Sequence, residues 1–295
     1  MLDALDERLR GLLARPCGRA ARILCAALTM LGFALVMTTR TLALGHAAAT
    51  AAVLCVPLAV MLIFAMRITK EHEQGVLYAL LLCALCAAAM LARVSFLERS
   101  SGDYDIYLAD WLQKLAGGSF GEGMRQNIGE YNVLYQYILF IITRLPVPSL
   151  YAVKAVSFIG DAFLAGAAAE LARKDGGKNA AAFGLALLLP TLVLNGGMFA
   201  QCDSLYAACA LWGLALALGD RPAGAAACFA LSLAFKLQAV FLLPIVAVLW
   251  ADKKLRLSDA LVFLLTLALT ALPALLGGKS FGALLSIYTA QTGLY

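Results

Sequence analysis

The sequence predicts an all-α fold, a polytopic transmembrane helix bundle with an extracytoplasmic loop that carries an amphipathic interfacial helix. Of its 295 residues, 63% are hydrophobic and 14% are charged, whereas a soluble domain has about 45–50% apolar and about 25% charged residues. The mean hydropathy is +0.86. Long apolar runs recur along the chain, and one membrane span needs about 20 such residues. The polar stretches between them are short, so we expect no separate soluble domain.

The first 22 residues are polar and rich in arginine, with acidic residues among the arginines. They lack the short basic start and apolar core of a signal peptide, so we expect a cytoplasmic amphipathic N-terminus (1–22) followed by the bundle (23–295). The sequence stops within a further apolar piece, and we expect it to be incomplete at its C-terminus. The apolar runs are 23–39, 43–66, 76–94, 133–145, 150–171, 180–194, 205–218, 223–235, 240–250, 257–276 and 281–295.

Lys and Arg in short loops predict the orientation, because such loops favour the cytoplasm. The segments assigned to the cytoplasm on this basis are 1–22, 67–70, 173–178, 220–221 and 252–256. These loops account for the net charge of +5, which predicts no nucleic-acid partner. The polar loop 96–131 is net acidic and is expected to be extracytoplasmic.

A crossing count built on these loops predicts one segment that does not span. An odd number of crossings must separate the acidic loop from Arg173, yet two apolar runs lie between them. The run 133–145 is too short for a span, so we expect a half-helix or re-entrant segment there. Broken backbone at membrane depth is tolerated only beside protein or a water-filled cavity, so this segment, like the short runs around Lys236, indicates a cavity.

The acidic loop holds the two candidate catalytic residues, Asp103 and Asp105. Helical spacing places Tyr104, Leu108, Trp111 and Leu115 on one face and Asp103, Tyr107, Asp110 and Lys114 on another. Such an amphipathic helix suits a membrane interface. Asp103 at its start is either a helix cap or a general base toward an acceptor hydroxyl. The Asp-Tyr-Asp sequence also leaves open a divalent metal held between substrate phosphates.

Three further polar clusters are candidate substrate-binding sites. Their residues are Tyr131 and Asn132, then Asn195, Gln201 and Asp203, and finally Lys236 and Gln238. Polar and charged residues within membrane segments are costly and mark functional sites by default. Lys236 either snorkels to the interface or neutralises a lipid phosphate, and the tyrosines that begin at Tyr131 either form an interfacial aromatic belt or bind substrate.

Asp161 is an acidic residue in the middle of the run 150–171. Lys154 precedes it by two helical turns on the same face. We expect a structural role for Asp161, paired inside the bundle, because an unpaired charge in a membrane is costly.

Four of these motifs, taken in order, resemble the GT-C superfamily of integral membrane glycosyltransferases. Gly102-Asp103-Tyr104-Asp105 with Trp111 resembles the opening of the family's first large outer loop, and Tyr131-Asn132 the start of its next helix. Asn195 to Asp203 resembles an Asn-x-x-x-Trp-x-Gln-x-Asp element, with Phe199 in place of the Trp. Lys236, Gln238 and Pro244 resemble a Lys-x-Gln element with a downstream proline. Three predicted spans precede the loop, where many members have one.

The resemblance implies a cavity that opens outward and an inverting transfer of a hexose to an acceptor hydroxyl. The donor would be a polyprenyl-phosphate sugar held in the membrane, and the acceptor a glycan, lipid or protein. Asp103 would be the base and Lys236 would contact the donor phosphate. The protein would then be a multi-pass protein of the cell membrane with a cytoplasmic N-terminus and an extracytoplasmic active site, and no cofactor is clearly required.

Two other functions remain open from the residues alone. A transporter or flippase of a lipid-linked or polar solute also places broken helices and charges at a central cavity. Its acidic groups are expected at mid-membrane rather than in a loop, and no internal repeat is visible here. A non-catalytic membrane scaffold would tolerate replacement of the loop acids.

Overall fold

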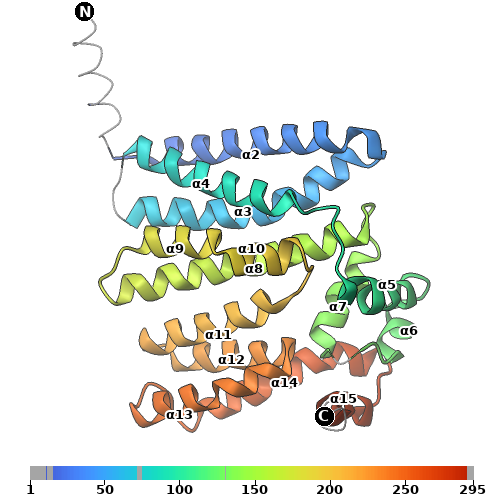
Figure 1. Cartoon of the computed structure of the whole chain (residues 1–295). Helices are drawn as coiled ribbons and strands as arrows, with labels where there is room; N and C mark the ends of the chain where they lie inside the picture. Colours follow the sequence, from blue (N-terminus) through green and yellow to red (C-terminus); the bar gives the residue numbers. More distant parts are fainter. Residues whose placement is uncertain (1–10, 12–15, 72–74, 130, 291–295) are drawn as a thin grey trace, which may run out of the picture.

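The structure is a computed structural model that describes residues 11, 16–71, 75–129 and 131–290. Within these residues the fold is an all-α bundle without a β-strand, as predicted. The long helices run roughly side by side, and the segments that connect them lie at the two ends of the bundle (Figure 1). We call the end with residues 96–131 the loop end, and the end with Arg67, Arg173 and Lys254 the basic end.

Three helices form the N-terminal part of the bundle. They are α2 (Arg19–Thr41), α3 (Ala47–Glu71) and α4 (Val76–Val94), with the short 3-10 helix η1 (Leu42–Leu44) after α2. Leu28, Leu31 and Leu35 of α2 are 58%, 68% and 64% exposed. So much apolar exposure fits a lipid-facing surface, as the predicted runs 23–39, 43–66 and 76–94 require. The predicted N-terminal segment 1–22 lies largely outside the described residues.

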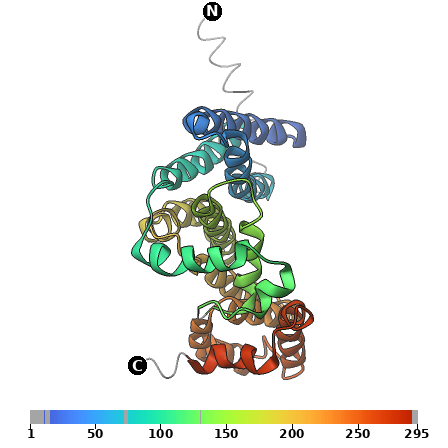
Figure 2. The ribbon, with the colours of Figure 1, turned by 90° about the vertical axis from the view of Figure 1, so that its right-hand side faces the viewer.

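The loop end is built from short helices. They are η2 (Tyr104–Leu108, a π-helical turn), α5 (Ala109–Ala116), α6 (Phe120–Arg125) and α7 (Val133–Ile142). The chain is helical from Gly102 onward. Ser119 and Glu122 form a reciprocal capping box at the start of α6, which satisfies otherwise unpaired backbone donors. Figure 2 looks onto this end and shows α5 and α6 lying across the bundle.

The amphipathic helix in the acidic loop is confirmed. Leu108, Trp111 and Leu115 are buried and pack in one cluster with α7 and α8 residues. Asp103 and Lys114 on the other face are exposed. The burial of the first face therefore fixes which residues of the loop point to solvent.

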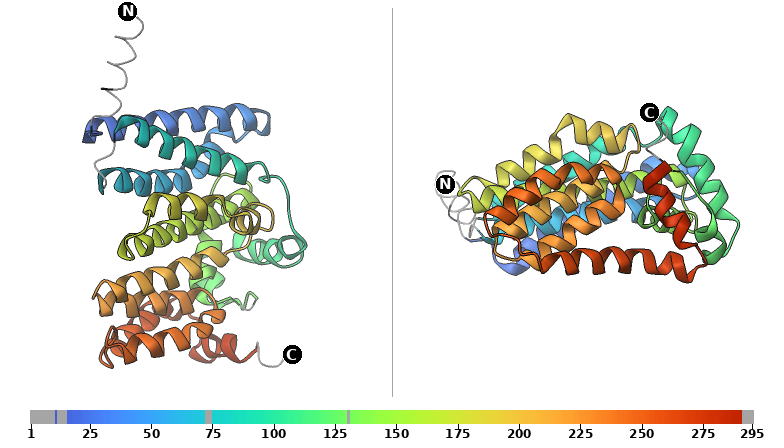
Figure 3. Two further views of the ribbon diagram at one scale, coloured as in Figure 1. Left: turned by 60° about the vertical axis from the view of Figure 1, so that its left-hand side comes forward. Right: turned by 90° about the horizontal axis from the view of Figure 1, so that it is seen from below.

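The second half of the bundle begins with α8 (Ser149–Lys174) and turns back and forth between the two ends (Figure 3). The elements that follow are α9 (Asn179–Leu188), α10 (Pro190–Gly197), α11 (Asp203–Leu218), α12 (Pro222–Phe235), η3 (Leu237–Leu242), α13 (Leu243–Ala251), α14 (Asp259–Leu276) and α15 (Phe281–Ala290). The bend between α9 and α10 is 46°. Pro190 lacks the N–H that would continue α9, and this explains the break.

By length and composition, five described helices are able to cross a membrane, and the bent pair α9–α10 makes a sixth. The five are α2, α3, α4, α8 and α14. The apolar helices α7, α11, α12 and η3 with α13 are shorter. The protein is therefore a multi-pass membrane protein whose spans differ in length.

The geometry of α7 resolves the crossing count. α8 begins at the loop end, where Lys154 donates to the carbonyl oxygen of Phe96 at 2.6 Å. It finishes at the basic end, where Glu170 pairs with Arg67 at 3.2 Å. α7 therefore has both of its ends at the loop end and runs across the direction of the long helices (Figure 1). As predicted, this short segment does not cross the bundle.

Candidate active site

The candidate site lies at the loop end, where the α10–α11 connection and the end of α12 meet the acidic loop. The Lys236 ammonium forms an ion pair with the Asp203 carboxylate. The Gln201 amide nitrogen donates to Oδ2 of Asp103 at 2.8 Å. These two contacts join three clusters that are far apart in the sequence, as their predicted common side requires.

Tyr131 lies at the centre of these groups. The Lys236 ammonium is 5.5 Å from its ring centre, within the range of a cation–π contact. The rings of Trp111 and Tyr135 lie 5.6 and 5.0 Å away. Burial, together with the charge of Asp203 nearby, raises the pKa of the Tyr131 phenol. The phenol therefore keeps its proton at neutral pH and is able to donate a hydrogen bond. Glu130 lies outside the described residues.

Asp103 is exposed, and its side chain makes no capping hydrogen bond. Ser101 caps the helix start instead, because its Oγ accepts from the backbone nitrogen of Tyr104 at 3.2 Å. The same hydroxyl donates to the carbonyl oxygen of Phe199 at 2.9 Å. The capping explanation of Asp103 is thus wrong, and its carboxylate is oriented by Gln201 from the α10–α11 connection.

The Asp105 side chain has a different hydrogen-bond partner from that of Asp103. Its Oδ2 accepts from the Ser100 hydroxyl at 2.9 Å, and the residue is exposed. In the described part of the chain, no three His, Cys, Asp or Glu side chains are grouped so that they could hold a metal ion. Of the two loop acids, Asp103 is the one connected to the other predicted site residues.

Asn132 connects α7 to the end of α12. The side chain is buried, and its amide nitrogen donates to the carbonyl oxygen of Leu233 at 2.7 Å. α12 ends because Lys236 adopts extended backbone angles, φ −152° and ψ 135°, so the last carbonyls need partners from elsewhere. Asn132 therefore holds the backbone that presents Lys236.

The other predicted binding residues lie nearby in different roles. The carbonyl oxygen of Asn195 accepts from the backbone nitrogen of Gln201 at 3.0 Å and closes the α10–α11 connection. Ala200 in this connection has φ +56° and is buried. The Asn195 side chain is half-buried, and Gln238 in η3 is exposed. Gln238 forms no side-chain hydrogen bond with Asp103, Asp203 or Lys236 within the described residues.

A buried ion pair lies inside the bundle near the site, and its residues were not among the predicted site residues. Arg93 of α4 donates through Nε to Asp161 of α8 at 2.8 Å, and both side chains are fully buried. Its Nη1 donates to the carbonyl oxygen of Leu187 at 2.9 Å, just before the α9–α10 break. The signal in the sequence was an arginine inside the predicted span 76–94. Asp161 is indeed paired within the bundle, but Lys154 binds loop carbonyls instead of this carboxylate.

An apolar cavity of about 380 Å³ lies beside Asn132, between α12, α14 and α15. Its walls include Asn132, Ala234, Leu267, Ala271, Phe281 and Leu284. The cavity is lined mostly by apolar side chains and adjoins the polar site at Asn132.

Comparison with known proteins supports a class of membrane glycosyltransferase. More particularly, residues 131–252 match a family model of the N-terminal domain of alpha-(1->6)-mannopyranosyltransferases. The match covers less than half of the chain and includes every predicted substrate-binding residue, but the loop with Asp103 and Asp105 precedes it. The chain matches no curated protein and no solved structure. The chain is therefore similar to a mannosyltransferase family, and this similarity supports glycosyl transfer as its activity.

Proposed function

We propose that the protein transfers a hexose, mannose in the first place, from a polyprenyl-phosphate-linked donor to an acceptor hydroxyl at the extracytoplasmic face. The observation that carries the proposal is the contact between Asp103 and Gln201 beside the pair of Lys236 and Asp203. It places a solvent-accessible carboxylate and a cation at one end of a membrane bundle. The positive-inside rule supports an extracytoplasmic loop end, because the basic loops lie at the opposite end.

Asp103 is the proposed general base. Gln201 donates to one carboxylate oxygen, and an acceptor hydroxyl would bind the other. A general base must lie within hydrogen-bond reach of the proton that it removes. A rigid amide partner favours one orientation of the carboxylate, so Gln201 is a positioning residue in this proposal.

Lys236 is the proposed partner of the donor phosphate. An ammonium group has three donors, and the structure shows one of them on Asp203. The Tyr131 and Tyr206 rings lie 5.5 and 6.0 Å from the ammonium. They favour a cation at this position, because aromatic faces attract positive charge. The apolar cavity beside Asn132 would accept the first part of the polyprenyl chain.

The proposed reaction uses these positions. The acceptor oxygen forms a bond to the anomeric carbon as the bond from that carbon to the phosphate oxygen breaks. The hydroxyl proton passes to Asp103, and the negative charge that develops on the leaving phosphate is stabilised by Lys236. Attack from the face opposite the phosphate inverts the anomeric centre.

The test replaces Asp103 by Asn in the full chain. The amide keeps the shape of the side chain but is no base, so mannose transfer from polyprenyl-phosphate mannose should fall by about 10²–10⁴-fold. Asp110→Asn is the matched control, because Asp110 is an exposed acid of the same helical face whose partner is Lys114 at 2.5 Å. Normal transfer by the Asp103 variant would refute the proposed base. Movement of a labelled lipid-linked sugar across vesicles without any acceptor would favour the transporter function instead.

A further inference from the structure

A polar pocket lies at the basic end, opposite the candidate active site. Its volume is about 230 Å³, and its charged and aromatic walls are formed by Arg67, Glu170, Arg173, Lys174, Trp212 and Arg221. Four basic side chains and one carboxylate thus line the pocket. The pocket lies where α3 and α8 end, beside the start of α12, and nothing in the proposed reaction uses it.

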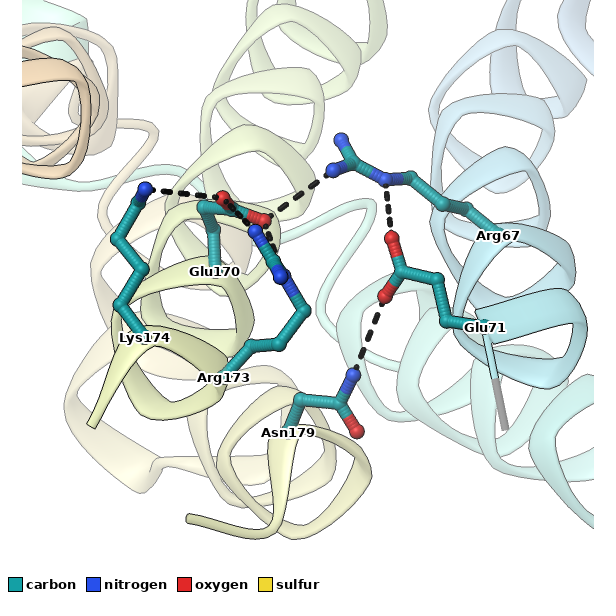
Figure 4. A network of polar contacts seen from close by, with 6 residues as sticks. All are labelled: Arg67, Glu71, Glu170, Arg173, Lys174 and Asn179. Carbon is teal, nitrogen blue, oxygen red and sulfur yellow. Dashed lines mark hydrogen bonds and ion pairs between the residues drawn. The ribbon is translucent and has the colours of Figure 1, made fainter. Parts of the chain in front are cut away.

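The carboxylate of Glu170 is the hub of this pocket (Figure 4). It accepts from Arg173 at 2.6 and 3.0 Å and from Arg67 at 3.2 Å, and the Lys174 ammonium is 3.7 Å away. Arg67 also bonds to Glu71 at 2.8 Å. One negative charge therefore faces three cations, and only one of these has a second carboxylate partner.

Arg221 adds a cation to the pocket wall that no acid neutralises. Its side chain forms no ion pair or hydrogen bond within the described part of the chain. Asp220, its neighbour, pairs with Lys254 at 2.9 Å and is 80% exposed. The hydrogen bond and charge of Lys254 lower the pKa of Asp220, and Lys174 contributes to this from a longer range. An excess of positive charge remains inside the pocket.

The side chains of this pocket suit the chemistry of a phosphate group. Guanidinium groups bind phosphate oxygens through paired N–H donors, and Arg67 keeps its Nη1 and Arg221 its whole guanidinium for such contacts. The Trp212 indole nitrogen donates to the carbonyl oxygen of Phe163 at 3.0 Å, and its ring stacks on Phe64 with centroids 6.1 Å apart. Tryptophan of this kind is typical of the membrane–water interface.

We propose that this pocket binds the headgroup phosphate of an anionic phospholipid. The pocket lies at the ends of membrane-spanning helices, it combines excess positive charge with an interfacial tryptophan, and basic pockets between such helices bind acidic headgroups. The lipid bridges α3, α8 and the α11–α12 turn, and so holds the two parts of the bundle together at the basic end.

The test measures phosphatidylglycerol binding to the full chain in dodecyl maltoside by native mass spectrometry, with phosphatidylcholine as the neutral lipid. The variant is Lys174→Ala with Arg221→Ala, which leaves the contacts of Glu170 with both arginines in place. A cation near an anionic headgroup contributes about 1 kcal/mol, so removal of two should weaken binding by about 30-fold. Lys178→Ala with Lys253→Ala is the charge-matched control, since both lysines are exposed at the same end and outside the pocket.

Selective binding of phosphatidylglycerol that only the pocket variant loses would support the site. Equal affinity of the two double variants would overturn it, because the binding would then follow surface charge alone. Inorganic phosphate that binds with the same variant dependence and displaces the lipid would also overturn the lipid assignment. If the double variant fails to fold, Arg221→Ala alone gives the same comparison with Lys178→Ala, at about fivefold weaker binding.

Discussion

The ion pair of Arg93 and Asp161 gives the sharpest test of how this bundle is held together. Both side chains are fully buried, and Nε of Arg93 lies 2.8 Å from Oδ2 of Asp161. Nη1 of Arg93 also donates to the carbonyl oxygens of Ala89 and Leu187 at 3.0 and 2.9 Å. Nη2 has no partner in the described part of the chain. The pair therefore ties α4 and α8 to the broken end of α9.

Removal of one partner should be far more harmful than removal of both. Asp161→Asn leaves the Arg93 charge buried without its carboxylate, and Arg93→Met leaves the opposite charge. Either change should destabilise the fold by about 3–5 kcal/mol, whereas replacement of both charges is often close to neutral. Here the double variant still loses the hydrogen bond to Leu187, a further cost of about 1 kcal/mol.

The assay is thermal unfolding of the purified protein in detergent. At about 2–4 °C per kcal/mol, each single variant should melt roughly 6–20 °C below the original protein, and the double variant should recover most of this loss. Asp110→Asn serves as the control, since it breaks an exposed pair with Lys114 and should cost less than about 1 kcal/mol. A double variant that is less stable than both single variants would contradict the reasoning, and so would single variants that melt like the control.

Three other changes test the site. Lys236→Gln should lower mannose transfer by about 10–100-fold, because a hydrogen bond to a charged group contributes about 1.5–3 kcal/mol. The loss should appear in kcat/KM for the lipid-phosphate donor, and unchanged kinetics would exclude Lys236 from the donor site. Gln201→Leu should reduce kcat without preventing membrane insertion, as measured by transfer and by protease protection, and a normal kcat would remove its positioning role. Burial raises the pKa of the Cys202 thiol to about 12, so iodoacetamide at pH 8 should label Cys202 in denaturant but not in the folded protein, as read by peptide mass spectrometry. Above pH 9 the folded thiol keeps a proton that the unfolded thiol loses, so the free energy of unfolding should decline as the pH rises. This decline should be absent in Cys202→Ala.

The sequence was sufficient to predict the bundle because the hydrophobic runs are long and the membrane limits what a backbone can do. The run 76–94 is matched by α4, and the short run 133–145 by the ten-residue α7. The sequence also predicted that Asp103, Gln201, Asp203 and Lys236 lie on one side of the membrane, and the structure places them at one end of the bundle. The pairwise contacts could not be predicted in this way, because sidedness does not specify which donor reaches which acceptor.

Lys154 shows why. Its spacing of two helical turns from Asp161 indicated a shared helical face, and both side chains are indeed buried within α8. The structure nevertheless turns the ammonium toward the carbonyl oxygens of Phe96 and Leu97 at 2.6 and 3.1 Å. The choice depends on how α4 ends and where its unpaired carbonyls lie, and this is a property of the packed bundle.

These buried charges explain how the Asp103 carboxylate, in an exposed loop, acquires a fixed position. Lys154 holds the carbonyls from which the acidic loop departs, so it positions the start of the helix that carries Asp103. Arg93 and Asp161 hold the end of α9 on the other side through the carbonyl oxygen of Leu187. α10 follows directly, and Gly196 lets it pack closely on α8, since a Cβ there would lie 3.2 Å from the Ser157 side chain.

Gln201 then closes the connection between these two supports by donating to Asp103. Charges in the membrane interior are costly, and here Lys154 and the Arg93–Asp161 pair each make contacts beside the candidate site. Loss of the Arg93 pair should therefore reduce glycosyl transfer even under conditions in which the variant remains folded, because the amide that orients Asp103 would shift with α10.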